Sequence, residues 1–328
     1  MVKKIVVFML VQCVISVYAL TCWADNPFLT ITGLVKHPLT LSVSDLNTFQ
    51  AVDVQINDID RAGKCRGAFN TRGIPLRHLL ELCKLEKEDP GFKKPVDLAI
   101  AVTDASGKQV VLSWGEVFYK NSADVSIAFS AVPIIPHHGC SAAYAEQLHR
   151  KVVFPKLVIA NDGCSDRSLE GIVNIEVIGL KPGIPFKTLK KLFSQEFSIV
   201  GKVKNTLAVN SLSPYRRTNI SFNVVGEGLG FKGVRSYQGV SLIELLGKAG
   251  VEPDWNTVFL VSAPDGYRSL VSYGELYLSP HGKDIILADQ EDGKPLDRDG
   301  KFMMVLPDDL FVDRAVRSVS MIEVISLK

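Results

Sequence analysis

Apolar and polar residues alternate in short stretches along the chain, and these stretches recur in the same order in its two halves. The alternation predicts strands at residues 31–41 and 175–178. Residues 73–80 begin with a glycine turn and continue with leucines on one face of a short helix. The corresponding pairs are 31–41 with 199–209, 73–80 with 239–246, 104–118 with 265–277, and 175–178 with 322–325. This order indicates a tandem repeat of one module.

The spacing of the repeat predicts where each module begins and ends. The offset between equivalent residues falls from 168 at Gly33 and Gly201 to 147 at Ile175 and Ile322, so the first copy carries about 21 extra residues. Most of them lie between Phe118 and Phe154. We predict a first module at 25–180, a linker at 181–192 and a second module at 193–328. Mixed strands and short helices favour an α+β fold for each module.

The N-terminal segment has the pattern of a secretory signal peptide. Lys3 and Lys4 precede an apolar run that ends at Ala24, and polar residues follow from Asp25. Cleavage after Ala24 would remove residues 1–24 and leave no membrane span. We therefore expect a periplasmic or secreted protein.

The charge balance excludes one class of partner. The chain has 37 basic and 35 acidic residues, and the predicted signal peptide contains two lysines and no acidic residue. The mature chain is thus neutral. Nucleic acid is not an expected partner, because its recognition needs clustered lysine and arginine.

The cysteines of the predicted mature chain, Cys65, Cys83, Cys140 and Cys164, all lie in its first half. An even number of cysteines in an oxidising compartment favours disulfides. Four cysteines allow three pairings, which the sequence does not resolve. The most local pairing joins Cys65 to Cys83 and Cys140 to Cys164.

Several motifs of the second copy resemble the molybdopterin-binding domain of sulfite-oxidase-type oxidoreductases. They are residues 239–250, 265–267, 287–289, 292–296, 305–307 and 322–324. The first copy resembles this family more weakly, through the repeat. The resemblance implies an α+β fold made of two tandem sulfite-oxidase-type modules with mixed sheets and short helices. It also implies a molybdenum–molybdopterin cofactor.

In this family a cysteine thiolate and the pterin dithiolene hold molybdenum, and basic residues near the last strand hold the pterin phosphate. The resemblance makes Cys65 the candidate metal thiolate, and Arg314 and Arg317 the candidate phosphate contacts. Two departures stand against this set. The second copy has no cysteine, and Glu170 occupies the position in the first copy that corresponds to Arg317.

The extra segment of the first copy contains a second group of candidate ligands. His137, His138, Cys140 and His149 lie within 13 residues, and imidazole and thiolate groups suit zinc or copper. The same segment could instead contact a substrate or the edge of a pterin, or be an ordinary loop tied down through Cys140.

Two functions remain open from the sequence. One is an exported redox subunit that binds a molybdenum–pterin cofactor. The alternative is a cofactor-free binding or accessory protein that keeps the fold as a scaffold for an unknown protein or small-molecule partner. A signal segment without arginine is typical of export as an unfolded chain, which favours the alternative.

Overall fold

The computed structural model describes residues 28–134 and 150–328, apart from residues 43 and 297. Strands make up 42% of it and helices 13%, so the fold is mainly β. The predicted α+β fold of two sulfite-oxidase-type modules is therefore wrong. The leucine pattern does form helices, but among the described residues the longest α-helix has 8 residues, whereas the longest strand has 12. The predicted signal peptide lies outside the described residues.

The described residues of the first half of the chain, here called the first repeat, form nine strands. Its elements are β1 (Leu29–Gly33), β2 (Leu39–Leu41), η1 (Ser44–Thr48), β3 (Val52–Ile59), β4 (Cys65–Pro75), α2 (Leu76–Cys83), η2 (Pro95–Asp97), β5 (Ala99–Asp104), β6 (Gln109–Ser113), α3 (Trp114–Phe118), β7 (Val125–Pro133), β8 (Lys156–Ile159) and β9 (Ile172–Ile178).

The second half is called the second repeat, and the part of it that the structure describes forms eleven strands. Its elements are β10 (Phe197–Gly201), β11 (Leu207–Val209), β12 (Thr218–Gly226), β13 (Gly230–Ser241), α5 (Leu242–Lys248), β14 (Thr257–Ser262), β15 (Arg268–Ser272), α6 (Tyr273–Tyr277), η3 (Gly282–Asp284), β16 (Ile286–Glu291), β17 (Lys294–Pro295), β18 (Met303–Val305), η4 (Val312–Arg314), β19 (Val316–Arg317) and β20 (Met321–Ser326).

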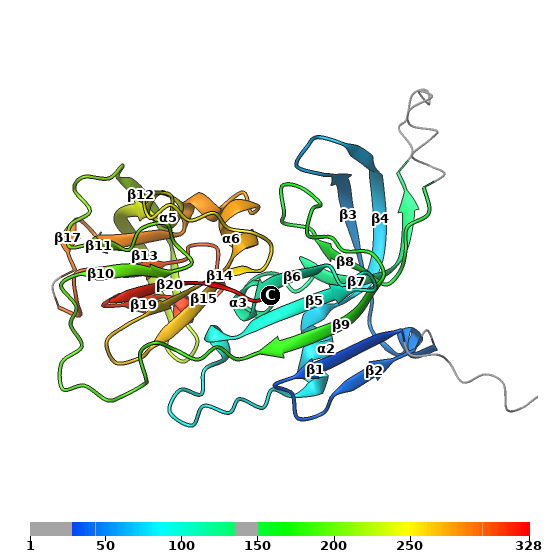
Figure 1. Ribbon diagram of the computed structural model, residues 1–328, viewed down its shortest axis with the longest axis horizontal. Helices are drawn as coiled ribbons and strands as arrows, with labels where there is room; N and C mark the ends of the chain where they lie inside the picture. The colour runs from blue at the N-terminus through cyan, green and yellow to red at the C-terminus, as the bar shows by residue number, and fades with distance from the viewer. Residues whose placement is uncertain (1–27, 43, 135–149, 297) are drawn as a thin grey trace, which may run out of the picture.

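The strands form four sheets, two in each repeat, and the two repeats lie side by side (Figure 1). One sheet of the first repeat has the order β2-β1-β9-β5-β6, and the corresponding sheet of the second has β11-β10-β20-β14-β15. The other sheets are β3-β4-β7-β8 and β12-β13-β16-β18-β19, with β17 beside β16. Both repeats thus use the same strand order.

A glycine at the end of the first strand illustrates this correspondence. Gly33 and Gly201 both have positive φ angles, of 89° and 93°. A Cβ at either position would lie within 2.4 Å of the carbonyl oxygen of Val177 or Val324 on the neighbouring parallel strand. Only glycine tolerates both the conformation and the contact.

The two repeats pack face to face through their five-stranded sheets. Alternate residues of β14 point to opposite sides, so Phe259 joins the core of the second repeat while Val258 and Leu260 face the first. Across the interface they meet Ala99 and Ala101 of β5. Because both faces of β14 are buried, its central residues 258–261 are all apolar, and the repeats form one packed unit.

No helix in the described part of the chain is long and apolar enough to cross a membrane.

Candidate functional site

Arg314, one of the two candidate phosphate contacts, is buried between the repeats. Its side chain is 1% exposed. Its Nε donates to Asp309 at 2.7 Å, and its Nη2 donates to Glu275 at 2.7 Å and also to Asp309. Its Nη1 donates to Ser113 of the first repeat and to the carbonyl oxygen of Leu270. These five hydrogen bonds match the five N–H groups of a guanidinium, so none is left for a phosphate.

Arg167 occupies the equivalent place in the first repeat, 147 residues earlier. Its Nε donates to Asp162 at 2.9 Å and its Nη1 to Glu116 at 3.3 Å. Glu116 also accepts a hydrogen bond from Ser272 of the second repeat at 2.8 Å, just as Glu275 accepts one from Ser113 at 2.6 Å. The contacts are reciprocal, and they join the two repeats through buried polar groups.

Two glycines make room for these arginines. A Cβ at Gly115 would lie 2.1 Å from Arg314, and one at Gly274 would lie 1.8 Å from Arg167. Each repeat therefore places a glycine at the start of a short helix, α3 or α6, where the arginine of the other repeat passes. The motif Trp-Gly-Glu-Val at residues 114–117 and its counterpart Tyr-Gly-Glu-Leu at residues 273–276 thus have a structural role at the interface.

The charges of this interface are not symmetric. Burial raises the pKa of Glu275, but Arg314 and Lys120 outweigh it and hold that pKa at about 2. Burial, together with Glu275, raises the pKa of Glu116 against the attraction of Arg167. Lys120 accounts for the difference, because it adds a second cation beside Glu275.

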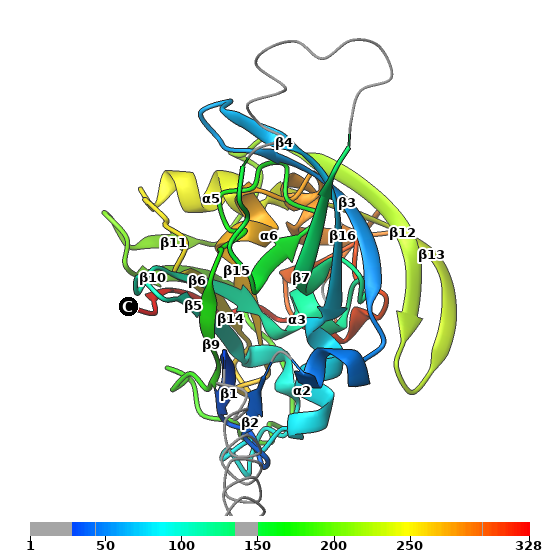
Figure 2. The same cartoon turned by 90° about the vertical axis from the view of Figure 1, so that its right-hand side faces the viewer.

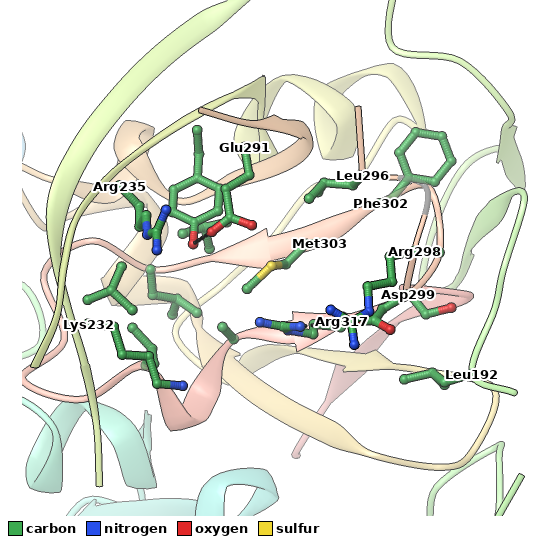
Figure 3. Close-up of a pocket in the computed structure, with 18 of the residues that line it drawn as sticks. Leu192, Lys232, Arg235, Glu291, Leu296, Arg298, Asp299, Phe302, Met303 and Arg317 are labelled. Carbon is green, nitrogen blue, oxygen red and sulfur yellow. Dashed lines mark hydrogen bonds and ion pairs between the residues drawn. The ribbon is translucent and has the colours of Figure 1, made fainter. Parts of the chain in front are cut away.

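A cavity of about 910 Å³ lies in the second repeat on the inner face of the sheet that begins with β12. This volume is within the range of small-molecule sites, roughly 300–1,000 Å³. Figure 3 shows Met303 in the middle of its wall, with Arg235 and Glu291 above and Arg317 below. Arg317, the other candidate phosphate contact, therefore lies in the cavity wall although Arg314 does not.

The wall combines an apolar floor with a charged rim. Its apolar residues include Phe222, Val224, Leu296, Phe302, Met303, Val305 and Val312. At the rim, Arg235 pairs with Asp292 at 2.6 Å and Arg317 with Asp299 at 2.8 Å. Three further cations, Lys232, Lys294 and Arg298, have no ion pair with any described residue.

Tyr237 and Ser318 also belong to the polar part of the wall. Tyr237 donates to Glu291 at 2.9 Å, and burial and this hydrogen bond raise the pKa of Tyr237. Ser318 has a positive φ of 54°, and its buried hydroxyl has no hydrogen-bond partner among the described residues.

The equivalent position in the first repeat is filled by ion pairs. Lys156 donates to Asp58 at 2.9 Å and to Glu170 at 3.2 Å, and Ser165 donates to Asp58 at 2.7 Å. Arg150 binds both carboxylates. Burial raises the pKa of Asp58, but the hydrogen bonds from Ser165 and Lys156 outweigh it and bring that pKa to about 2.

The strand registers relate these groups to the cavity wall. Lys156 faces Glu170 as Met303 faces Arg317, and Asp58 lies at the same bulge of its hairpin as Val224. Ser165 corresponds to Val312. Apolar side chains thus replace Asp58, Lys156 and Ser165 in the second repeat, and the space between them is open.

The cysteines lie apart from this cavity. Cys65 is exposed at the start of β4 in the first repeat, Cys83 is buried on α2, and Cys164 is half-buried. Neither Cys83 nor Cys164 is in a disulfide, so the pairing of Cys65 with Cys83 is not formed. Cys140, His137, His138 and His149 lie outside the described residues. Within the described ranges, no group of three or more histidine, cysteine or acidic side chains could hold a metal.

These residues do not fit a molybdenum–pterin centre at the cavity. A soft metal of this kind needs sulfur ligands, and the described wall offers no cysteine, only the thioether of Met303. Of the two candidate phosphate contacts, only Arg317 reaches the wall. The predicted roles of Cys65, Arg314 and Arg317 toward a cofactor remain predictions.

The residues at the interface and in the cavity were largely missed by sequence reasoning. The offset of 147 that relates Arg317 to Glu170 also relates Arg314 to Arg167 and Asp309 to Asp162. Extending this alignment would have indicated a paired structural role for the two arginines. The cavity has no comparable signal, because its wall comes from segments between Leu192 and Ser318 that meet only after folding.

Comparison with known proteins does not assign the chain to a family. No protein-family model matches it, and no curated protein matches its sequence. Among solved structures it is similar to the sulfane dehydrogenase SoxCD from Paracoccus pantotrophus, with 14% identity and a TM-score of 0.34. That similarity covers 93% of this chain and 78% of the other. A similarity this low does not establish a family or an activity.

Proposed function

We propose that this chain is an exported binding protein that holds one small organic anion in the cavity of the second repeat. Export is inferred from the N-terminal pattern of a signal peptide. The observation that carries the binding function is the contrast between the repeats. The position that ion pairs fill in the first repeat is a cavity of about 910 Å³ in the second.

The wall supports a ligand with an apolar body. Val224, Met303 and Val312 stand where the first repeat has charged or polar groups. An apolar ligand surface against these side chains would leave no polar group unsatisfied. The size of the cavity fits a molecule of one to three rings.

The rim supports an acidic group on that ligand. Lys232, Lys294 and Arg298 have no ion pair within the described part of the chain. A carboxylate, sulfonate or phosphate can accept hydrogen bonds from such donors. The nearby carboxylates of Asp292 and Asp299 are already paired with arginines.

The test is a titration with 1-anilinonaphthalene-8-sulfonate, which joins an apolar ring system to one sulfonate. We expect saturable binding of one molecule per chain, measured by the increase in the fluorescence of the bound probe. In Met303→Trp the larger side chain fills the centre of the cavity, so we expect the affinity to fall by about tenfold or more.

Leu310→Trp is the matched control. Leu310 is 55% exposed and does not line the cavity, so the same substitution there should leave the affinity unchanged. Urea unfolding of both variants establishes that they are folded. Equal binding by Met303→Trp and the natural chain would contradict the proposal.

A further inference from the structure

The strand β12 is a long sheet edge that carries no charge or proline and is interrupted by a single bulge at Val224. It lies at the end of the order β12-β13-β16-β18-β19 and has nine residues, Thr218–Gly226. None of them is charged and none is proline. Natural sheets usually protect such edges with charges, prolines or short strands, because a free edge pairs with other chains. Figure 2 shows β12 and β13 as a curved hairpin at one side of the molecule.

The equivalent edge in the first repeat is protected. Strand β3 carries Asp53 and Asp58, and Asp53 forms an exposed ion pair with Arg72. The backbone carbonyl of Ile59, at the end of β3, also accepts a hydrogen bond from Ser165. Across the part of the chain that the structure describes, no backbone group of residues 219–225 is bonded outside its own sheet.

The hairpin of the second repeat also exposes apolar side chains. Phe231 and Val234 of β13 are 65% and 64% exposed, and they lie opposite Val225 and Asn223 of β12. The residues at the same positions of the first hairpin are the smaller Cys65 and Ala68. The second hairpin therefore presents both a free edge and an apolar surface beside it.

We infer that two copies of this chain associate through antiparallel pairing of β12 with β12, in a register centred on Phe222. In this register Ile220 lies opposite Val224 of the second copy, and Phe222 lies opposite its own counterpart. These three positions share the inner face of the sheet, so apolar side chains meet apolar side chains.

The charges that flank the strand favour the antiparallel direction. Arg217, which also binds Asp289 of its own chain, precedes β12, and Glu227 follows it. Antiparallel pairing centred on Phe222 places Arg217 opposite Glu227 of the second copy, whereas parallel in-register pairing would place like charges together. The sheets of the two copies would then join into one continuous sheet, with their inner faces on the same side. This inference depends on β12 alone and not on what the cavity binds.

The test compares two lysine substitutions on one face of the same hairpin. Ser221 of β12 and Ser236 of β13 are opposite each other and both exposed. Ser221→Lys places a charge on the edge strand, and Ser236→Lys places the same charge on the adjacent inner strand. Sedimentation of the mature chain over a range of concentrations should show a dimer for the natural sequence and for Ser236→Lys. For Ser221→Lys we expect the dissociation constant to rise by about tenfold or more.

The register is tested by restoring charge balance. In the proposed pairing residue 221 lies opposite residue 223 of the second copy, so Ser221→Lys combined with Asn223→Glu should restore the dimer. A chain that stays monomeric at every concentration would overturn the inference. So would equal effects of the two lysine substitutions, or a double variant that remains as weakly associated as Ser221→Lys.

Discussion

The two repeats use the same strand order but differ in the space beneath their long hairpins, which is filled in the first repeat and open in the second. In the first repeat, Asp58, Lys156 and Glu170 fill the space beneath the β3–β4 hairpin with ion pairs. In the second, Val224 and Met303 leave a cavity with Arg317 in its wall. The difference teaches that a few side chains decide whether this architecture encloses a rigid ionic core or an open site.

The physical reason lies in the cost of burying charge. A buried lysine is stable only if carboxylates surround it, and Lys156 has two. Once those groups are apolar, no partner holds a charged side chain in the space, and the cavity stays open. The interface between the repeats shows the opposite case, because Arg167 and Arg314 keep equivalent partners there.

The largest expected effect follows from breaking the ionic core. Asp58→Ala leaves Lys156 with one carboxylate in a buried site, so we expect a loss of about 3–5 kcal/mol in the free energy of unfolding. The matched change Val224→Ala removes two methyl groups from a wall that is already open, with an expected loss of about 1 kcal/mol. Urea unfolding at neutral pH measures both. Equal losses would mean that the two positions do not differ as described.

A smaller effect concerns pH. The pKa of Asp58 is about 2 in the folded chain, below its usual value of about 3.9. Its ionised form therefore stabilises the fold above about pH 4, and this contribution of about 2 kcal/mol is lost as the pH falls toward 2.

The variant Asp58→Asn isolates this contribution from that of Glu275. Between pH 5 and pH 2, the free energy of unfolding of the natural chain should fall by about 2 kcal/mol more than that of Asp58→Asn. Unfolding curves at a series of pH values measure the difference. Parallel pH profiles would show that Asp58 is not held ionised by its neighbours.

The smallest expected effect comes from placing the Asp58–Lys156 ion pair of the first repeat at the equivalent positions of the second. Val224→Asp and Met303→Lys each place a charge in the cavity wall without its partner. Together they recreate the pair formed by Asp58 and Lys156. We expect a favourable coupling energy of about 1 kcal/mol in a double-mutant cycle. Additive effects would indicate that the two positions are not opposed across the cavity.

Sequence reasoning was most successful where the signal is local. The alternation at residues 31–41 and the leucines at 73–80 predict β1, β2 and α2 because the side-chain period of each element appears in the sequence itself. It failed on the fold class, because helices of five to eight residues were given the same weight as strands that run to 12.

The candidate site was less accessible to sequence reasoning. Arg314 and Arg317 are three residues apart and looked equivalent, yet one is buried at the interface and the other lines a cavity. The partners that decide this, Ser113 and Gly115 for Arg314, lie about 200 residues away. No local pattern reports such a contact.

The sequence by itself determined the repeat, the order of short elements and the glycines that close strands, because each depends on neighbouring residues along the chain. Only the tertiary structure decided which charges are buried together, which space is left open and which strand edge is left unpaired. These properties depend on groups from distant segments, and the energy of a charge or a cavity is set by what surrounds it after folding.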